Sequence, residues 1–227
     1  MNKLLLVLLI IPLALFYGCS ATTYTADYKT SLSRVERPVK AVQLYGASQI
    51  SSLPDSSKYN FSFEDSLVKI SWSANSKEIN LLIKNKTNNT VKIPWDEAAF
   101  VDKDGFSHRV IHSSIDYLDK EKPQPPSVIV RNGLLEDSII PTDYLKWIEI
   151  GGEHPLSYWN LESFFPDNIN SKDSKLDDHS VLVIFVSAVK LNIGKEFQIL
   201  LPLQCNDNTY EYIFIFKIDS VNVVTKK

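Results

Sequence analysis

The chain has 227 residues, with 24 basic and 27 acidic side chains and a formal net charge of −3 at pH 7. This mildly acidic balance provides no basic surface for a polyanion, so we expect no nucleic-acid partner. The only cysteines are Cys19 and Cys205. A chain of this length can bury about 70% of its unfolded surface, so one domain can fold around a core without disulfides.

Residues 1–18 have the pattern of a secretory signal. Lys3 precedes an apolar run from Leu4 to Phe16, which is shorter than the ~20 apolar residues of a helix that spans a bilayer. A basic start, a short apolar core and a small residue before the cleavage point are typical of such signals. Gly18 is that small residue, and Cys19 follows it. The alternative is an ordinary cleaved signal with an incidental cysteine.

The segment Phe16-Tyr17-Gly18-Cys19 resembles the lipobox of bacterial lipoproteins. The resemblance implies a diacylglyceryl group on the thiol of Cys19 and cleavage before that residue. Two or more acyl chains hold a protein stably on a membrane. The resemblance therefore implies that the protein contacts a membrane through its lipid anchor. By resemblance to lipoprotein sorting in enteric bacteria, Ser20 in place of Asp implies the periplasmic face of the outer membrane.

Residues 19–58 are predicted to form a tether between the lipid and the domain. They are rich in Ser, Thr, Ala and Asp, and no apolar period is sustained along them. A weak amphipathic patch that includes Leu32 and Val35 is interrupted by Pro38. We therefore expect the folded domain to cover residues 59–227.

From residue 59 onward, alternating apolar and polar residues predict a series of short strands. Asn-rich and Gly-containing turns separate several of them, which is typical of antiparallel hairpins. The predicted strands are Leu67–Trp72, Ile79–Lys84, Val91–Trp95, Phe100–Val101, Val110–Ile111, Ser127–Val130, Ile139–Ile140, Val181–Val189, Glu196–Leu203 and Tyr210–Val224. Such a series favours an all-β fold, an antiparallel β-sandwich.

Residues 142–180 break the strand pattern. Gly151, Gly152, Pro155 and Pro166 interrupt any periodicity, so this region is predicted to be an irregular loop. Within it, only Leu161–Phe165 could form a helical turn.

The stretch from Glu78 to Ser113 resembles the Ig-like domains found in bacterial lipoproteins. The resemblance is carried by Ile79–Thr87, by Val91-Lys92-Ile93, and by Phe100 with Asp104-Gly105. It covers only part of the chain. It implies an Ig-like β-sandwich in the cell envelope, in a family whose function is mostly unassigned.

His108 and His112 are the first candidate metal ligands. On a strand they share one face, but two residues four apart lie ~13 Å from each other, too far to bind one metal ion. Asp102-Lys103-Asp104-Gly105 begins like a calcium loop, yet the later ligands are missing. We therefore predict surface or edge histidines, a hairpin turn, and no metal or other cofactor.

The remaining catalytic candidates are acidic pairs and one thiol. Asp96-Glu97 and Asp177-Asp178 each place two carboxylates together, but general acid–base catalysis needs such groups to face each other across a pocket. Solvated loop carboxylates are the simpler interpretation. Nothing near Cys205 would activate a thiolate, so it is interpreted as a small apolar residue at a strand end. The sequence predicts no catalytic residue and no enzyme activity.

Five aromatic residues gather in the predicted loop: Trp147, Tyr158, Trp159, Phe164 and Phe165. Aromatic side chains on a loop can stack on a sugar or anchor a protein partner. The alternative is that they cap an open end of the sandwich.

Three functional hypotheses follow from these patterns. The leading one is a non-enzymatic, lipid-anchored accessory or assembly subunit of an envelope complex, with an envelope protein as partner. The alternative is a glycan or small-ligand binding module that uses the aromatic loop at 142–180. The third is a divergent hydrolase, which only the scattered acidic residues favour.

Overall fold

A computed structural model describes residues 22–54, 56–151 and 156–226, and these residues form an antiparallel all-β fold. The strands are β1 (Thr23–Glu36), β2 (Gln49–Ser52), β3 (Phe61–Glu64), β4 (Val68–Ala74), β5 (Ile79–Asn85), β6 (Val91–Ile93), β7 (Ala99–Val101), β8 (Ser107–His112), β9 (Ser127–Ile129), β10 (Leu134–Pro141), β11 (Leu145–Ile150), β12 (Leu156–Leu161), β13 (Asn168–Asn170), β14 (Glu196–Cys205) and β15 (Asn208–Lys226). The helices are α1 (Val39–Tyr45) and α2 (Asp178–Lys190), and four short 3₁₀ turns complete the elements.

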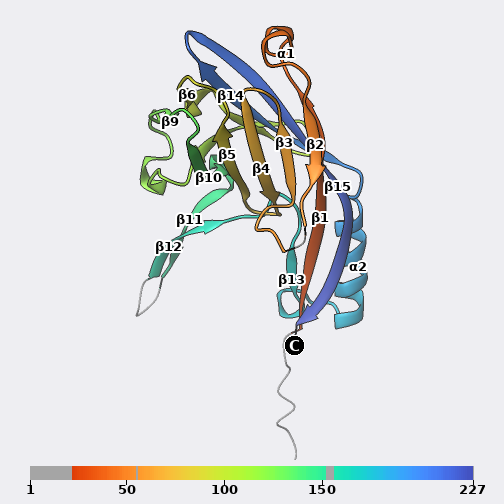
Figure 1. Ribbon diagram of the computed structural model, residues 1–227. Coiled ribbons are helices and arrows are strands. Elements are labelled where there is room, and N and C mark those ends of the chain that lie inside the picture. Colours follow the sequence, from red (N-terminus) through yellow and green to blue (C-terminus); the bar gives the residue numbers. More distant parts are fainter. Residues whose placement is uncertain (1–21, 55, 152–155, 227) are drawn as a thin grey trace, which may run out of the picture.

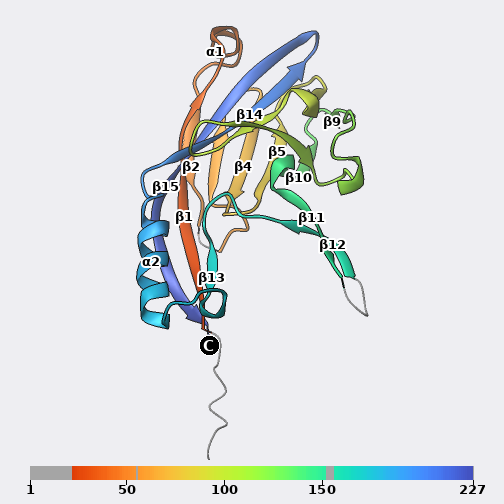
Figure 2. The same cartoon turned by 180° about the vertical axis from the view of Figure 1, so that it is seen from behind.

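One curled sheet runs in the order β13-β1-β15-β14-β7-β8-β10-β5-β4-β3-β2, and β6 pairs with β14 while β9 pairs with β6. The curl brings the two ends of this path over each other, so that β1, β14 and β15 form one layer and β2 to β5 with β10 form the other (Figures 1 and 2). The result is a sandwich-like arrangement of two layers. It confirms the all-β class that the sequence predicted.

Aromatic side chains from facing strands fill the space between the layers. Trp72 of β4 lies 4.7 Å from Phe214 and 5.6 Å from Phe216 of β15, measured between ring centroids. Phe63 of β3 contacts Phe214 edge-on at 5.4 Å. These positions follow directly from the period-2 alternation along β4 and β15, whose inward residues are fully buried.

The predicted tether at 19–58 is wrong from residue 23 onward. Residues 23–36 form β1, which pairs with β15 from Thr23 opposite Lys226 to Glu36 opposite Ile213. Tyr24, Ala26 and Tyr28 alternate inward and are buried. Register shifts at Lys29/Thr30 and near Leu32 break the period, which is why the sequence shows no sustained alternation. Cys19 and the predicted signal lie outside the described residues.

The connection from β1 to α1 is held by a buried ion pair. The guanidinium of Arg37 donates to Asp65 Oδ2 at 3.0 Å, and the Tyr212 hydroxyl donates to the same oxygen at 2.8 Å. The other oxygen, Oδ1, accepts the backbone N–H groups of Leu67 and Val68. Asp65 therefore joins the end of β1, the β3–β4 turn and β15, and burial beside it raises the pKa of Tyr212.

The residues predicted as a strand at 181–189 form helix α2 instead. The side chain of Asp177 caps the helix by accepting the Ser180 N–H at 3.0 Å. Val181, Phe185 and Val189 recur every four residues and are buried against the sheet. The β-branched run favours a strand locally, but this helical burial pattern outweighs it. No helix in the described ranges is long and apolar enough to cross a membrane.

The predicted irregular loop at 142–180 is more ordered than expected. Residues 145–150 and 156–161 form the hairpin β11–β12, and 168–170 form β13. The predicted helical turn at Leu161–Phe165 is absent, since β12 ends at Leu161 and the backbone then bends.

Replacing Asp65 should test how strongly the buried ion pair supports the fold. Asp65→Ala should lower the free energy of unfolding by about 3–5 kcal/mol, because it leaves a buried guanidinium without its partner. Asp219→Ala is the matched control, since Asp219 makes an exposed hydrogen bond to Ser31. Urea unfolding followed by tryptophan fluorescence measures both, and equal stability of the two variants would contradict the prediction.

Candidate functional site

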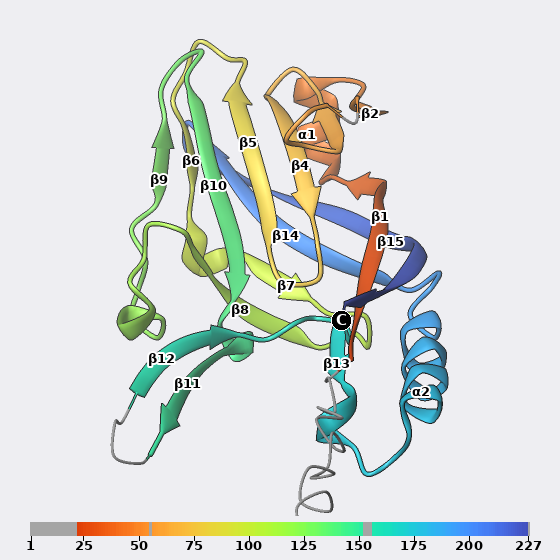
Figure 3. The same cartoon turned by 90° about the horizontal axis from the view of Figure 1, so that it is seen from below.

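The most distinctive surface feature is the two-stranded sheet of β11 and β12, here called the ribbon. Within the described part of the chain its strands pair only with each other, with Trp147 opposite Trp159 and Ile150 opposite Leu156. The ribbon extends away from the sandwich (Figures 1 and 3). A two-stranded hairpin is marginally stable in water on its own, so its base must be held by other contacts.

A small apolar cluster holds the base of the ribbon. Leu145 is buried with Ile111 and Ile140. Trp159 packs edge-on against Tyr117 at 6.1 Å. The ammonium group of Lys120 lies 5.5 Å from the Trp159 ring and donates to the carbonyl oxygen of Leu145 at 3.1 Å. These contacts fix the direction in which the ribbon leaves the domain.

Beyond the base, the ribbon exposes apolar side chains on both faces. Alternation places Trp147 on one face, where it contacts the ring of Trp159 at 5.3 Å, and Ile150, Leu156 and Tyr158 on the other. These four side chains, Trp147, Ile150, Leu156 and Tyr158, are 43% to 57% exposed and are called the ribbon patch. Clustered exposed apolar residues of this kind mark interaction surfaces.

The five aromatic residues singled out in the sequence are thus divided between two places. Trp147, Tyr158 and Trp159 belong to the ribbon. Phe164 and Phe165 are buried instead. Phe164 lies 4.9 Å from Phe100, and Phe165 lies 5.5 Å from Phe197. Sequence reasoning missed Ile150 and Leu156, whose only signal is their position on either side of Gly151 and Gly152.

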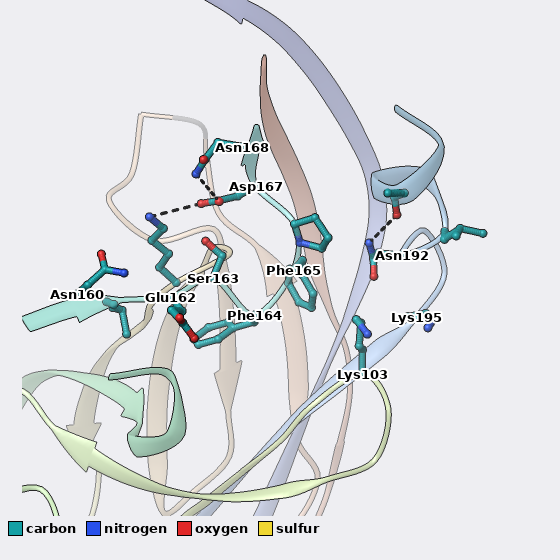
Figure 4. Close-up of a pocket in the computed structure, with 15 residues that line it drawn as sticks. Lys103, Asn160, Glu162, Ser163, Phe164, Phe165, Asp167, Asn168, Asn192 and Lys195 are labelled. Carbon is teal, nitrogen blue, oxygen red and sulfur yellow. Dashed lines mark hydrogen bonds and ion pairs between the residues drawn. The ribbon is translucent and has the colours of Figure 1, made fainter. Parts of the chain in front are cut away.

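An open pocket of about 820 Å³ lies along residues 162–168, between the end of β12 and the end of α2 (Figure 4). Its wall includes Lys103, Lys195 and the Lys77–Asp167 ion pair at 3.6 Å. Its other lining residues are Asn160, Leu161, Glu162, Ser163, Phe164, Phe165, Pro166, Asn168, Ala188, Leu191 and Asn192. The Tyr28 hydroxyl donates to the carbonyl oxygen of Pro166 at 2.8 Å, and burial raises the pKa of Tyr28 to about 12.

His108 lies between two carboxylates. Its Nδ1 is 2.7 Å from Asp143 and its Nε2 is 3.2 Å from Asp102. Burial acts to lower the pKa of His108, but the two carboxylates more than offset this and raise it above the usual value. Asp102 also accepts the N–H groups of Asp104 and Phe106. The segment Asp102–Gly105 is therefore the predicted hairpin turn, with φ of +90° at Gly105.

The prediction of a surface or edge histidine is wrong for His112, which is buried on β8 between β7 and β10. Its neighbours resemble part of a Ser-His-Asp arrangement without having its geometry. Asp137 Oδ2 lies 2.9 Å from Nδ1, and hydrogen bonds from His112 and Ser113 lower the Asp137 pKa although burial opposes this. The Ser114 hydroxyl oxygen is 3.2 Å from both ring nitrogens, so it lies over the ring face. Proton transfer needs the hydroxyl in line with Nε2. Trp95 stacks at 4.7 Å.

The other residues considered for catalysis, the acidic side chains and the cysteine thiol, make structural contacts or are buried. Asp96 accepts from Arg109 and from the Gln124 N–H, while Asp178 accepts from Thr22. Cys205 is buried at the end of β14. Among the residues that the structure describes, no group of three or more His, Cys, Asp or Glu is arranged to hold a metal ion.

In comparisons with known proteins, no family model, no curated protein and no solved structure matches the chain.

Truncating a buried core side chain should destabilise the fold more than truncating a side chain of the ribbon patch. Phe165→Ala should lower the free energy of unfolding by about 3–5 kcal/mol, as for other buried Phe residues. Trp147→Ala should cost less than about 1.5 kcal/mol, because half of the side chain is exposed and its partner is one ring. Chemical denaturation of both variants measures this. A Trp147→Ala variant as unstable as Phe165→Ala would make the ribbon patch part of the core.

Proposed function

We propose that this protein is a lipid-anchored, non-enzymatic accessory or assembly subunit of a cell-envelope complex, and that the ribbon docks on an envelope protein. The observation that carries the proposal is the ribbon patch, four apolar side chains about half exposed on a hairpin outside the main sheet. Protein interfaces are centred on such aromatic and aliphatic anchors, which become buried only in the complex.

The proposed location of the protein is supported by its sequence. The pattern of residues 1–18 and the lipobox-like Phe16–Cys19 support export, lipidation of Cys19 and retention on a membrane. We propose the periplasmic face of the outer membrane as the site. The antiparallel sandwich-like fold is compatible with the Ig-like resemblance of residues 78–113, and we propose that class for the domain.

The absence of enzyme activity is part of the proposal. It is supported by the positions of the two best candidates for general acid–base chemistry. His108 is bound by Asp102 and Asp143, and His112 has the Ser114 hydroxyl over its ring rather than in line. Each histidine instead forms hydrogen bonds that join its strand to neighbouring segments.

A second candidate function is a glycan or small-ligand binding module, and the pocket favours it. Residues Asn160–Asn168, all within the region suggested by the sequence, line one side, and Lys103 and Lys195 lie on another (Figure 4). Aspartate, asparagine and lysine side chains can bind sugar hydroxyls or anionic groups. Aromatic stacking would have to come from elsewhere, because Phe164 and Phe165 are buried.

Charged substitutions in the ribbon test the leading proposal. The double variant Ile150→Asp/Leu156→Asp places two charges where the partner's apolar surface would lie, so recovery of a co-purifying envelope protein should fall at least about tenfold. The control Leu118→Asp/Leu134→Asp charges two apolar sites outside the ribbon, which are 74% and 63% exposed. Quantitative mass spectrometry after mild detergent extraction compares them with the unmodified protein.

The proposal is contradicted if every captured envelope protein is retained by the ribbon variant. If, in addition, a glycan array shows binding that Asn160→Ala and Lys195→Ala abolish, the ligand-binding function replaces it. Both variants carry exposed changes, so their melting temperatures should stay close to that of the unmodified protein.

A further inference from the structure

Helix α2 is apolar on both of its sides. Val181, Phe185 and Val189 face the sheet and are buried. On the outer side, Val183 and Ile184 of the helix are 50% and 54% exposed, and they line a shallow hollow with Leu176, which lies just before the helix and is 50% exposed. We call these three residues the outer α2 face. A helix on the surface of a soluble domain usually presents charged and polar residues there. The outer α2 face therefore needs a partner of its own.

Beyond its first turn, helix α2 carries no acidic side chain. From His179 to Lys195 the sequence contains no acidic residue. Lys190 in the last turn of α2 is exposed, as is Lys175 just before the helix. Acidic residues lie at its two ends: Asp173 is exposed before the helix, Asp177 caps the first turn, Asp178 accepts from Thr22, and Asp104 pairs with Lys195 after the helix. Exposed apolar residues flanked by lysines are typical of helices that lie in a lipid headgroup region.

The start of β1 lies against the first turn of this helix. The Thr22 hydroxyl donates to Asp178 Oδ2 at 3.0 Å, and the Tyr24 hydroxyl donates to the Asp178 carbonyl at 3.2 Å. Cys19 is three residues before Thr22, and three residues span at most ~11 Å. A lipid on Cys19 would thus enter the membrane within ~11 Å of Thr22, beside the end of α2 where the outer face begins.

We propose that the outer α2 face lies in the headgroup and upper acyl region of the membrane that holds the Cys19 lipid, as a second membrane contact. This inference rests on the lipid anchor of the proposed function. The helix is ~20 Å long at 1.5 Å per residue, so a contact along it fixes the orientation that a single flexible anchor would leave free. The bilayer is the occupant because the chain leading to the lipid ends beside this face.

The orientation leaves the ribbon available. Helix α2 and the β11–β12 ribbon lie on opposite sides of the domain in all three views (Figures 1, 2 and 3). With α2 on the lipid, the ribbon extends away from the bilayer. One face is then used for the membrane and the other for the partner protein.

Depth-dependent quenching tests the inference on the full-length lipidated protein. Val183→Cys carries an environment-sensitive fluorophore on the outer α2 face, and Leu134→Cys carries it on β10, where the native side chain is 63% exposed against 50% for Val183. The native Cys205 is buried and should not be labelled. The protein is reconstituted into phosphatidylethanolamine–phosphatidylglycerol vesicles that contain acyl-chain quencher lipids. Quenching at position 183 should exceed that at position 134 by at least about threefold.

Flotation of the same vesicles reports the anchor separately. If the protein floats and position 183 is quenched selectively, the inference is supported. If it floats and positions 183 and 134 are quenched equally or not at all, the second contact is ruled out while the anchor stands. If intact lipidated protein does not float, the anchor itself fails, and the inference fails with it. Photo-crosslinking from position 183 to a protein rather than to lipid would also overturn it.

Discussion

The antiparallel pairing of β1 with β15 is the constraint on which the rest of the arrangement depends. It joins the first described residues to the last strand of the chain, from Thr23 opposite Lys226 to Glu36 opposite Ile213. It therefore makes the N-terminal segment part of the sheet rather than a spacer. It also sets Thr22 against α2, which defines where a lipid on Cys19 would meet the domain.

The buried pair of Arg37 and Asp65 extends this constraint into the other layer. Asp65 accepts from Arg37, from Tyr212 and from two backbone N–H groups, so each lone-pair direction of the carboxylate has a donor. A fully satisfied buried charge of this kind fixes the relative positions of the segments that meet there. Trp72, Phe214 and Phe216 then fill the space between the layers.

Much of the fold could be predicted from local patterns. The alternation along residues 67–72, 79–84 and 210–224 identifies strands, and Asn206–Asn208 identifies the turn between β14 and β15, which the structure confirms. These strands are buried on one face, so the sequence period reflects their environment directly.

What could not be predicted depends on contacts distant in sequence. The alternation of β1 is interrupted by register shifts, and its partner is almost two hundred residues away. Helix α2 has β-branched residues that favour a strand, and the four-residue spacing of its buried residues becomes evident only from its packing against the sheet.

For the candidate site, Trp147, Tyr158 and Trp159 could be identified as aromatic residues. Their placement on a hairpin with Ile150 and Leu156 could not, because the glycines between the strands suggested an irregular loop.

Two exposed apolar surfaces on opposite sides of one rigid sandwich form the basis of the functional account. The ribbon is held at its base by Trp159, Tyr117 and Lys120, so the ribbon patch is presented in a fixed direction. Preorganisation of this kind lowers the entropic cost of binding a partner. The outer α2 face lies beside the proposed anchor. Together they support the proposal of a small adaptor that would hold an envelope protein at a defined orientation to the membrane.

Site-specific photo-crosslinking in living cells tests the central claim most directly. A photoreactive amino acid at position 158 of the otherwise unchanged protein samples the ribbon patch in its native setting, and the same amino acid at position 134 serves as the control. The account predicts one discrete adduct with an envelope protein from position 158 and none from position 134. No adduct from position 158, or the same set of adducts from both positions, would contradict the ribbon as a docking surface.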